Sequence, residues 1–142
     1  MATSLQRKAL IARAREAKSR AYAPYSRFRV GAANLADDGT IIDGCNVENS
    51  SYSLTICAER NAVFQAASMG KTRLRAIAIA SDDPAFLPPC GACRQVLSEF
   101  NPAMEIILTT AGGKTRVTSL AKLFPMPADL KKLARTGSVK RR

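Results

Sequence analysis

The sequence predicts an α/β fold in which one mixed sheet carries helices on both faces. Short apolar or alternating segments are typical of strands, and longer segments with apolar residues at helical spacing are typical of helices. Two strands come first, and helices and strands then alternate. We therefore expect a three-layer α/β/α sandwich with a mixed five-stranded sheet. The length of 142 residues, of which 46% are hydrophobic, predicts a single domain over residues 1–142.

The first half of the chain predicts a helix followed by a hairpin. Residues 5–22 carry apolar side chains at helical spacing with basic residues between them, and Pro24 ends that pattern. Residues 27–35 alternate as a half-buried strand does, and residues 40–47 form a second strand. Asp37, Asp38 and Gly39 between them are a strong turn signal. A polar loop over residues 48–55 follows.

The second half predicts alternating helices and buried strands. Further helices are expected over residues 56–69, 90–100, 119–124 and 128–134. Further strands are expected over residues 75–80, 105–110 and 114–117, with a proline-rich loop over 82–89. The basic tail at residues 136–142 is expected to fray.

The net charge of +11 invites a nucleic-acid partner, but the charge is concentrated at the two ends. Residues 1–20 and 129–142 each hold six basic residues against one acid, whereas residues 21–128 hold ten against nine. The chain also has only eight aromatic residues, so residues 21–128 lack the basic groups and the stacking side chains that a polynucleotide site needs. We interpret the basic ends as solvated faces.

The chain shows neither a membrane span nor a secretory leader, so we expect a soluble cytoplasmic protein with no membrane partner. In that reducing compartment, four cysteines indicate metal binding or catalysis before disulfides. Histidine is absent, which excludes an imidazole base, an imidazole metal ligand and every nucleophile that depends on histidine.

Three cysteines stand at the starts of two predicted helices. Cys90 and Cys93 form a C-x-x-C pair, and Cys57 has the same position on its own helix. Helix N-termini lower thiol pKa values, which makes these residues anionic ligands for a soft divalent ion. Three protein ligands leave the fourth position of zinc open for water, the catalytic arrangement. Glu59, two residues after Cys57, can reach that water without ligating the metal. This layout matches the signature of zinc deaminases in its three-cysteine version.

Four blocks of sequence resemble one family, the small homotetrameric cytidine deaminases. The blocks are residues 23–33 (Ala-Pro-Tyr-Ser-x-Phe-x-Val-Gly-Ala-Ala), 44–52 (Gly-Cys-Asn-Val-Glu-Asn, then Ser-Tyr), 57–60 (Cys-Ala-Glu-Arg) and 89–95 (Pro-Cys-Gly-Ala-Cys-Arg-Gln). The resemblance covers about residues 5–125, and four blocks in order make it specific.

This resemblance implies a zinc site and its proton carrier. Cys57, Cys90 and Cys93 would hold one zinc ion per chain, and Glu59 would move protons between the water, the pyrimidine N3 and the leaving ammonia. Three thiolates on a dication leave a negative charge, which Arg60 would offset by donating to the sulfurs.

The resemblance also implies how substrate is bound. Phe28 would line the pyrimidine pocket, Asn46 and Glu48 would hydrogen-bond the ribose hydroxyls, and the backbone N–H of Ala58 would read the 2-carbonyl. The expected activity is hydrolytic deamination of cytidine and 2′-deoxycytidine to uridine and 2′-deoxyuridine in pyrimidine salvage. The expected assembly is a homotetramer with shared active sites.

One departure and several alternatives accompany this interpretation. Ala128 stands where the family has an aromatic residue that closes a neighbouring subunit's pocket, which leaves room for modified or N4-substituted cytidines or a nucleoside antibiotic such as blasticidin S. A nucleic-acid cytosine deaminase is a further alternative. Another is a binding module with structural zinc, in which Cys45 would be the fourth ligand. As an isolated cysteine, Cys45 is better interpreted as a small buried hydrophobe.

Overall fold

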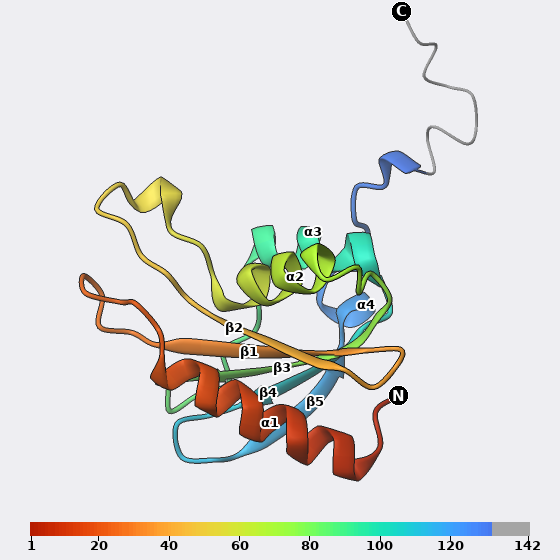
Figure 1. Ribbon diagram of the computed structural model, residues 1–142, viewed down its shortest axis with the longest axis horizontal. Coiled ribbons are helices and arrows are strands. Elements are labelled where there is room, and N and C mark those ends of the chain that lie inside the picture. Colours follow the sequence, from red (N-terminus) through yellow and green to blue (C-terminus); the bar gives the residue numbers. More distant parts are fainter. Residues whose placement is uncertain (132–142) are drawn as a thin grey trace, which may run out of the picture.

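A computed structural model describes residues 1–131, so the predicted tail at 136–142 and the last three residues of the predicted helix at 128–134 lie outside the described residues. The sheet has five strands in the order β2-β1-β3-β4-β5 (Figure 1). Their bounds are β1 Val30–Ala36, β2 Ile41–Cys45, β3 Leu74–Ser81, β4 Glu105–Thr109 and β5 Thr115–Ser119. Within residues 1–131, no helix combines the length and the apolar character that crossing a membrane requires.

The sheet is mixed, as predicted. β1 pairs antiparallel with β2 in the expected hairpin and with β3 on its other side. β3 and β4 are parallel, and β5 returns antiparallel to β4. The connection between the parallel strands contains α3 (Gly91–Phe100), which is the crossover that a parallel pair requires.

Helices cover both faces of the sheet, which confirms the three-layer sandwich (Figure 1). α1 (Ser4–Ser19) lies on one face, and α2 (Ala58–Ser68) and α3 lie on the other. Along β1, Ala33 and Leu35 pack in the core beneath α1, whereas Ala32 and Ala36 belong to the larger core beneath α2 and α3. This alternation is the period of two that strands impose.

Two glycines allow the helices to lie close to the hairpin. A Cβ atom at Gly31 would lie 2.0 Å from the carbonyl oxygen of Ala14 in α1, and one at Gly44 would lie 2.4 Å from the amide nitrogen of Ala62 in α2. Neither position can carry a side chain unless a helix moves. Gly44 therefore sets how closely α2, and with it Cys57 at its start, approaches the sheet.

The basic face of α1 is solvated only in part: Lys8, Arg13 and Arg15 are exposed as the sequence predicts, whereas Arg7 and Lys18 are partly buried. Four basic residues pair with acids at the sheet: Arg7 with Glu105 at 2.9 Å, Arg13 with Asp43 at 2.8 Å, Lys18 with Asp82 at 2.8 Å, and Arg20 with Asp43 at the end of the helix. Glu105 and Asp43 have side chains only 6% and 12% exposed, so these ion pairs anchor α1 to the sheet even though the Arg13 and Arg20 side chains are 48% and 56% exposed. The sequence pattern does not predict these ion pairs, because the acidic partners lie far from α1 in the sequence.

Several element boundaries also differ from prediction. The strand expected over 27–35 begins only at Val30, because Arg27 has a φ of 57°, which breaks extended backbone. The helix expected from residue 56 begins after Cys57, which is its N-cap with extended backbone. The first helix ends at Ser19, and the helix expected over 119–124 is the short α4 (Leu120–Leu123).

Candidate metal centre and pocket

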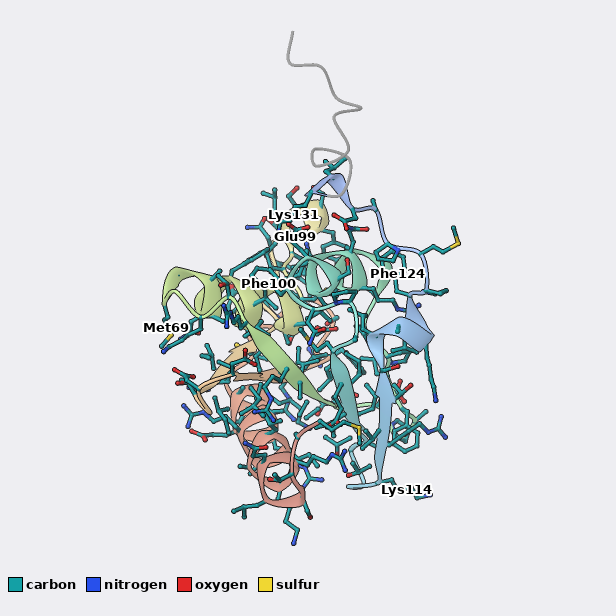
Figure 2. The ribbon with its side chains drawn as sticks, turned by 90° about the vertical axis from the view of Figure 1, so that its right-hand side faces the viewer. Met69, Glu99, Phe100, Lys114, Phe124 and Lys131 are labelled. Atoms are coloured by element: carbon teal, nitrogen blue, oxygen red, sulfur yellow. The ribbon has the colours of Figure 1, made fainter. Side chains whose placement is uncertain are left out.

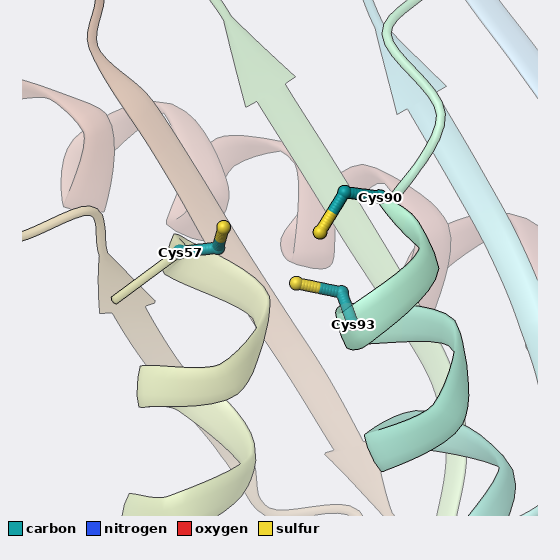
Figure 3. Close-up of side chains that lie close together, drawn as sticks. All are labelled: Cys57, Cys90 and Cys93. Atoms are coloured by element: carbon teal, nitrogen blue, oxygen red, sulfur yellow. The ribbon is translucent and has the colours of Figure 1, made fainter. Parts of the chain in front are cut away.

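Three cysteine sulfurs converge where two helices begin (Figure 3). Cys57 is the N-cap of α2, Cys90 is the N-cap of α3, and Cys93 lies one turn further along α3. The three Sγ atoms all lie within 4.8 Å of one another. The structure therefore brings together the three cysteines that the sequence predicts as a metal site.

The thiols influence one another's ionisation. The pKa of Cys57 is lowered to about 5, because the Cys93 thiol and then the Arg60 guanidinium hydrogen-bond its sulfur. The pKa of Cys93 is raised, because its proton is shared with Cys57, the group is buried, and the Glu59 charge lies nearby. Three thiolates this close repel one another, and a divalent cation between them relieves that repulsion.

The donor set fits zinc. Zinc–thiolate bonds of about 2.3 Å in tetrahedral geometry place sulfurs about 3.8 Å apart, compatible with this cluster. Cys45 is not a member of the cluster; it lies at the end of β2 with its Sγ 3.5 Å from the carbonyl oxygen of Arg20. Three cysteine ligands without Cys45 correspond to the open, catalytic arrangement rather than to a closed structural site. Cys45 is also half-buried rather than fully buried.

Arg60 lies beside the sulfurs on the first turn of α2. Its Nη2 is 3.6 Å from Cys57 Sγ and 3.5 Å from the carbonyl oxygen of Thr55. The interaction with Cys57 raises the pKa of this guanidinium, which therefore stays charged. A fixed positive charge at this point offsets part of the negative charge of the thiolates.

Glu59 is a buried carboxyl group beside the cluster. It is only 6% exposed, and burial raises its pKa to about 7. It shares a pocket of about 120 Å³ with Cys57, Ala58 and Cys90. A carboxyl group with a pKa near neutrality can both accept and donate a proton at the pH of the cell.

The wall of this pocket comes from three parts of the chain. Val30 at the start of β1, Leu87 and Pro88 in the loop before α3, and the start of α2 line it. A second concavity of about 250 Å³ is lined by Ser26, Glu48, Tyr52 and Thr55, and Thr55 lies just two residues before Cys57.

A larger concavity of about 400 Å³ lies away from the cysteines, between α3 and residues 127–131. Glu99 and Lys131 are an ion pair at its side, with their atoms 2.7 Å apart (Figure 2). None of its lining residues belongs to the cysteine cluster.

Asn46 and Glu48, the predicted ribose contacts, hold residues 25–30 in place. Asn46 Oδ1 accepts from the amide of Val30 at 2.8 Å, and its Nδ2 donates to the carbonyl oxygen of Phe28 at 2.9 Å. Glu48 accepts from the amides of Tyr25 and Ser26 at 2.9 and 3.2 Å. The hydroxyl of Ser26 is the main cause that lowers the pKa of Glu48. Contact of either side chain with ribose stays a prediction.

Phe28 is partly buried and packs against the larger core. Its backbone carbonyl is held by Asn46, as described above, and its amide donates to the Ser26 hydroxyl oxygen at 3.0 Å. This places it next to Val30, which lines the pocket. Its contact with a bound base stays a prediction.

The sequence pattern assigned no role to Arg94, the residue that directly follows Cys93. Its Nε donates to the carbonyl oxygen of Pro89 at 2.7 Å, and its Nη1 donates to that of Leu123 at 2.8 Å. Arg94 thus ties the peptide that precedes Cys90 to the end of α4. Its partners are backbone carbonyls, which leave no signal in a sequence pattern.

Comparison with known proteins identifies close relatives. The family model described as the cytidine and deoxycytidylate deaminase zinc-binding region matches residues 4–110. The chain is 52% identical to the cytidine deaminase of Sporosarcina psychrophila over 117 residues, and this matched region covers 82% of this chain and 86% of that protein. It is 47% identical to the cytidine deaminase of Halalkalibacterium halodurans over 122 residues, which are 85% of this chain and 92% of that protein.

Solved structures agree with these relatives. The crystal structure of cytidine deaminase from Burkholderia pseudomallei has a TM-score of 0.82 and 47% identity, covering 85% of this chain and 98% of that chain. That of cytidine deaminase from Mycobacterium tuberculosis has a TM-score of 0.76 and 41% identity, covering 90% and 99%.

Proposed function

The chain belongs to the family of the cytidine and deoxycytidylate deaminase zinc-binding region, and on that premise we propose which of its residues carry the reaction. It is a zinc-dependent cytidine deaminase, which converts cytidine and water to uridine and ammonia. The observation that carries the assignment of roles is the buried carboxyl group of Glu59 in one pocket with cysteines of the three-sulfur cluster.

Cys57, Cys90 and Cys93 hold the zinc ion in this proposal. Bound there, zinc supplies Lewis acidity that makes a water molecule nucleophilic near neutral pH. Arg60, 3.6 Å from Cys57 Sγ, keeps the thiolate charge from weakening that acidity. Cys90 and Cys93 are set on one side of α3 by their spacing, and Arg94 fixes the peptide that leads into Cys90.

Glu59 carries the protons. It accepts one proton from the attacking water and delivers it to N3 of the pyrimidine as the C–O bond forms at C4. It then moves the second proton of that water to the amino group, which leaves as ammonia when the C–N bond breaks. Both transfers need a group that is a base in one step and an acid in the next, and the pKa of about 7 supports this role.

Substrate recognition involves the two concavities around residues 25–30. The base occupies the pocket beside Glu59, with Phe28 along its wall and the N–H of Ala58 facing the 2-carbonyl. The ribose lies towards Glu48, which lines the second concavity. Asn46 and Glu48 retain unused hydrogen-bonding capacity after their contacts with the backbone, so each can also bind a ribose hydroxyl.

The assembly proposed is a homotetramer with shared active sites. Five exposed apolar side chains in residues 22–25 and 47–54 support it: Tyr22, Tyr25, Val47, Tyr52 and Leu54 are between 45% and 70% exposed. Tyr25 and Tyr52 are in ring contact at 5.9 Å between centroids. Apolar groups gathered in this way on a monomer mark a surface that another chain covers.

A substrate comparison tests the proposed function. Zinc-quantified protein is mixed with cytidine, 2′-deoxycytidine and free cytosine, and the fall in ultraviolet absorbance is followed. Deamination of the nucleosides without that of the free base supports both the chemistry and the ribose contacts. A flat trace with cytidine from zinc-loaded protein would contradict the proposal and favour a modified cytosine, such as an N4-substituted one, which the same assay then screens.

A further inference from the structure

Asp82 joins three separate parts of the chain at the point where β3 ends. Its Oδ2 accepts from the backbone amide and the Nε of Arg29, each at 3.1 Å. Its Oδ1 accepts from Nζ of Lys18 in α1 at 2.8 Å. Its own amide donates to the carbonyl oxygen of Arg29 at 3.1 Å. One carboxylate therefore fixes the backbone of residue 29 and binds two cations.

Arg29 lies between the proposed base contact Phe28 and a residue that lines the pocket. Phe28 precedes it, and Val30, which lines the pocket beside Glu59, follows it. Phe28 and Arg29 precede β1, whose first residue, Val30, pairs with Ser81 of β3, and the positive φ of Arg27 ends the extended backbone just before them. The carbonyl oxygens of Arg29 and Val30 accept from the backbone amides of Asp82 and Asn46, but the amides of Arg29 and Val30 donate to side chains, so the position of this stretch depends in part on side-chain contacts.

The stretch is held from two sides. Asn46 holds the carbonyl of Phe28 and the amide of Val30, at 2.9 and 2.8 Å. The carboxylate of Asp82 accepts from the amide of Arg29, and the backbone amide of Asp82 donates to the carbonyl oxygen of Arg29. Asp82 also begins the loop that supplies Leu87 and Pro88 to the same pocket. Asp82 is therefore bonded to the residue before Val30 and begins the loop that leads to Leu87 and Pro88, so it lies at the base of two segments that line this pocket.

We propose that Asp82 is a positioning residue for substrate binding, acting through Arg29 to hold Phe28 and Val30 in place at the pocket. The inference rests on the proposed function, because it assigns Asp82 to the site that binds the base. The Asp82 side chain is 26% exposed and Lys18 is 20% exposed, so water competes with the pair less than at an open surface. The charge of Asp82 matters because both of its partners are cations.

The substitution Asp82→Asn tests this role because it keeps the size of the side chain and removes its charge. A looser wall weakens ground-state and transition-state binding alike, so KM for cytidine should rise about tenfold while kcat stays within about twofold. Zinc content should not change, because Asp82 touches no cysteine of the cluster.

Asp38→Asn is the matched control. Asp38 also accepts from a backbone amide, that of Thr40 at 3.0 Å, and pairs with a lysine, Lys71, but it lies in the turn between β1 and β2. Its substitution should leave KM and kcat at wild-type values. Equal kinetics for the Asp82 and Asp38 variants would overturn the proposal. A loss of zinc or of kcat in the Asp82 variant, with KM unchanged, would overturn it as well.

A double-mutant cycle separates positioning from general destabilisation. Arg29→Gln removes only the guanidinium contact and leaves the bonds of Asp82 to the Arg29 amide and to Lys18, so KM should rise by a smaller factor. The double variant should be no worse than Asp82→Asn alone, because that substitution already weakens the shared contact. Fully additive effects would mean that Asp82 does not act through Arg29. Measuring the wild-type protein in parallel separates a failure of the proposed function from a failure of this inference. If the wild-type protein does not turn over cytidine, the proposed function is refuted. If it does and the kinetics of the Asp82 variant are unchanged, only this inference is refuted.

Discussion

Replacing Asn34 with valine should stabilise the protein. Asn34 lies in the middle of β1, is fully buried, and faces the core beneath α2 together with Ala32 and Ala36. Neither its Oδ1 nor its Nδ2 has a hydrogen-bond partner among the described residues. A buried amide without partners loses its bonds to water and gains nothing in return. Valine has a similar size, suits a strand, and carries no polar atom.

The size of the effect follows from that burial. An unsatisfied buried polar group costs about 1–3 kcal/mol, and removing it should recover most of this. For a chain of this length, such a gain raises the unfolding midpoint by roughly 3–10 °C. Thermal and denaturant unfolding of both proteins, at one fixed protein concentration, measure the difference.

Asn101→Val is the control for this measurement. Asn101 donates to the carbonyl oxygen of Leu74 at 2.9 Å and accepts from the amide of Ala103 at 3.0 Å, so its amide is satisfied. The same substitution there should lower stability by about 0.5–1.5 kcal/mol. If Asn34→Val lowered stability as much as Asn101→Val, the Asn34 amide would have a partner such as an internal water, and the reasoning would be refuted.

Three further outcomes follow from the structure. Cys45→Ala should leave metal at about one zinc per chain, measured by atomic absorption, because Cys45 is outside the cluster; loss of the metal would restore the structural-zinc interpretation. Glu105→Gln should destabilise the protein most at neutral pH. Arg7 holds the pKa of Glu105 below 4.5, so the pair contributes above that pH and its contribution disappears as pH falls through the lowered pKa. A difference in unfolding free energy that stayed constant on acidification would show that this pair is not the cause. If residue 128 closes a neighbouring subunit's pocket in the proposed tetramer, Ala128→Phe should reduce kcat/KM for N4-alkylated cytidines about tenfold or more relative to cytidine; an unchanged ratio would show that residue 128 does not border a substrate site.

The residues of the metal centre could be predicted because their signals are local. Cys57, Cys90 and Cys93 each occupy a helix start that spacing and capping reveal, and Glu59 follows one of them at fixed spacing. The mixed five-stranded sheet was predictable for the same reason, since periodicity identifies each strand, whereas the order of the strands comes from the structure. Local pattern also gave the turn between β1 and β2.

Features that depend on distant partners could not be predicted in this way. Asp82 and Asn46 act on residues 28–30 from other parts of the chain, and nothing in their own neighbourhood indicates it. The left-handed backbone of Arg27, which shortens the predicted strand, has no compositional signal. The ion pairs of Arg7 and Lys18 in α1 were not predictable, because their partners Glu105 and Asp82 are far away in sequence.

The most direct test of the central claim replaces Glu59 with glutamine and measures both zinc and turnover. Glutamine keeps the shape of the side chain but cannot carry protons, so the variant should retain about one zinc per chain while kcat for cytidine falls at least about 100-fold. Glu99→Gln, at an exposed carboxylate paired with Lys131, is the control and should keep full activity. A zinc-loaded Glu59 variant that deaminates cytidine at the wild-type rate would contradict the account.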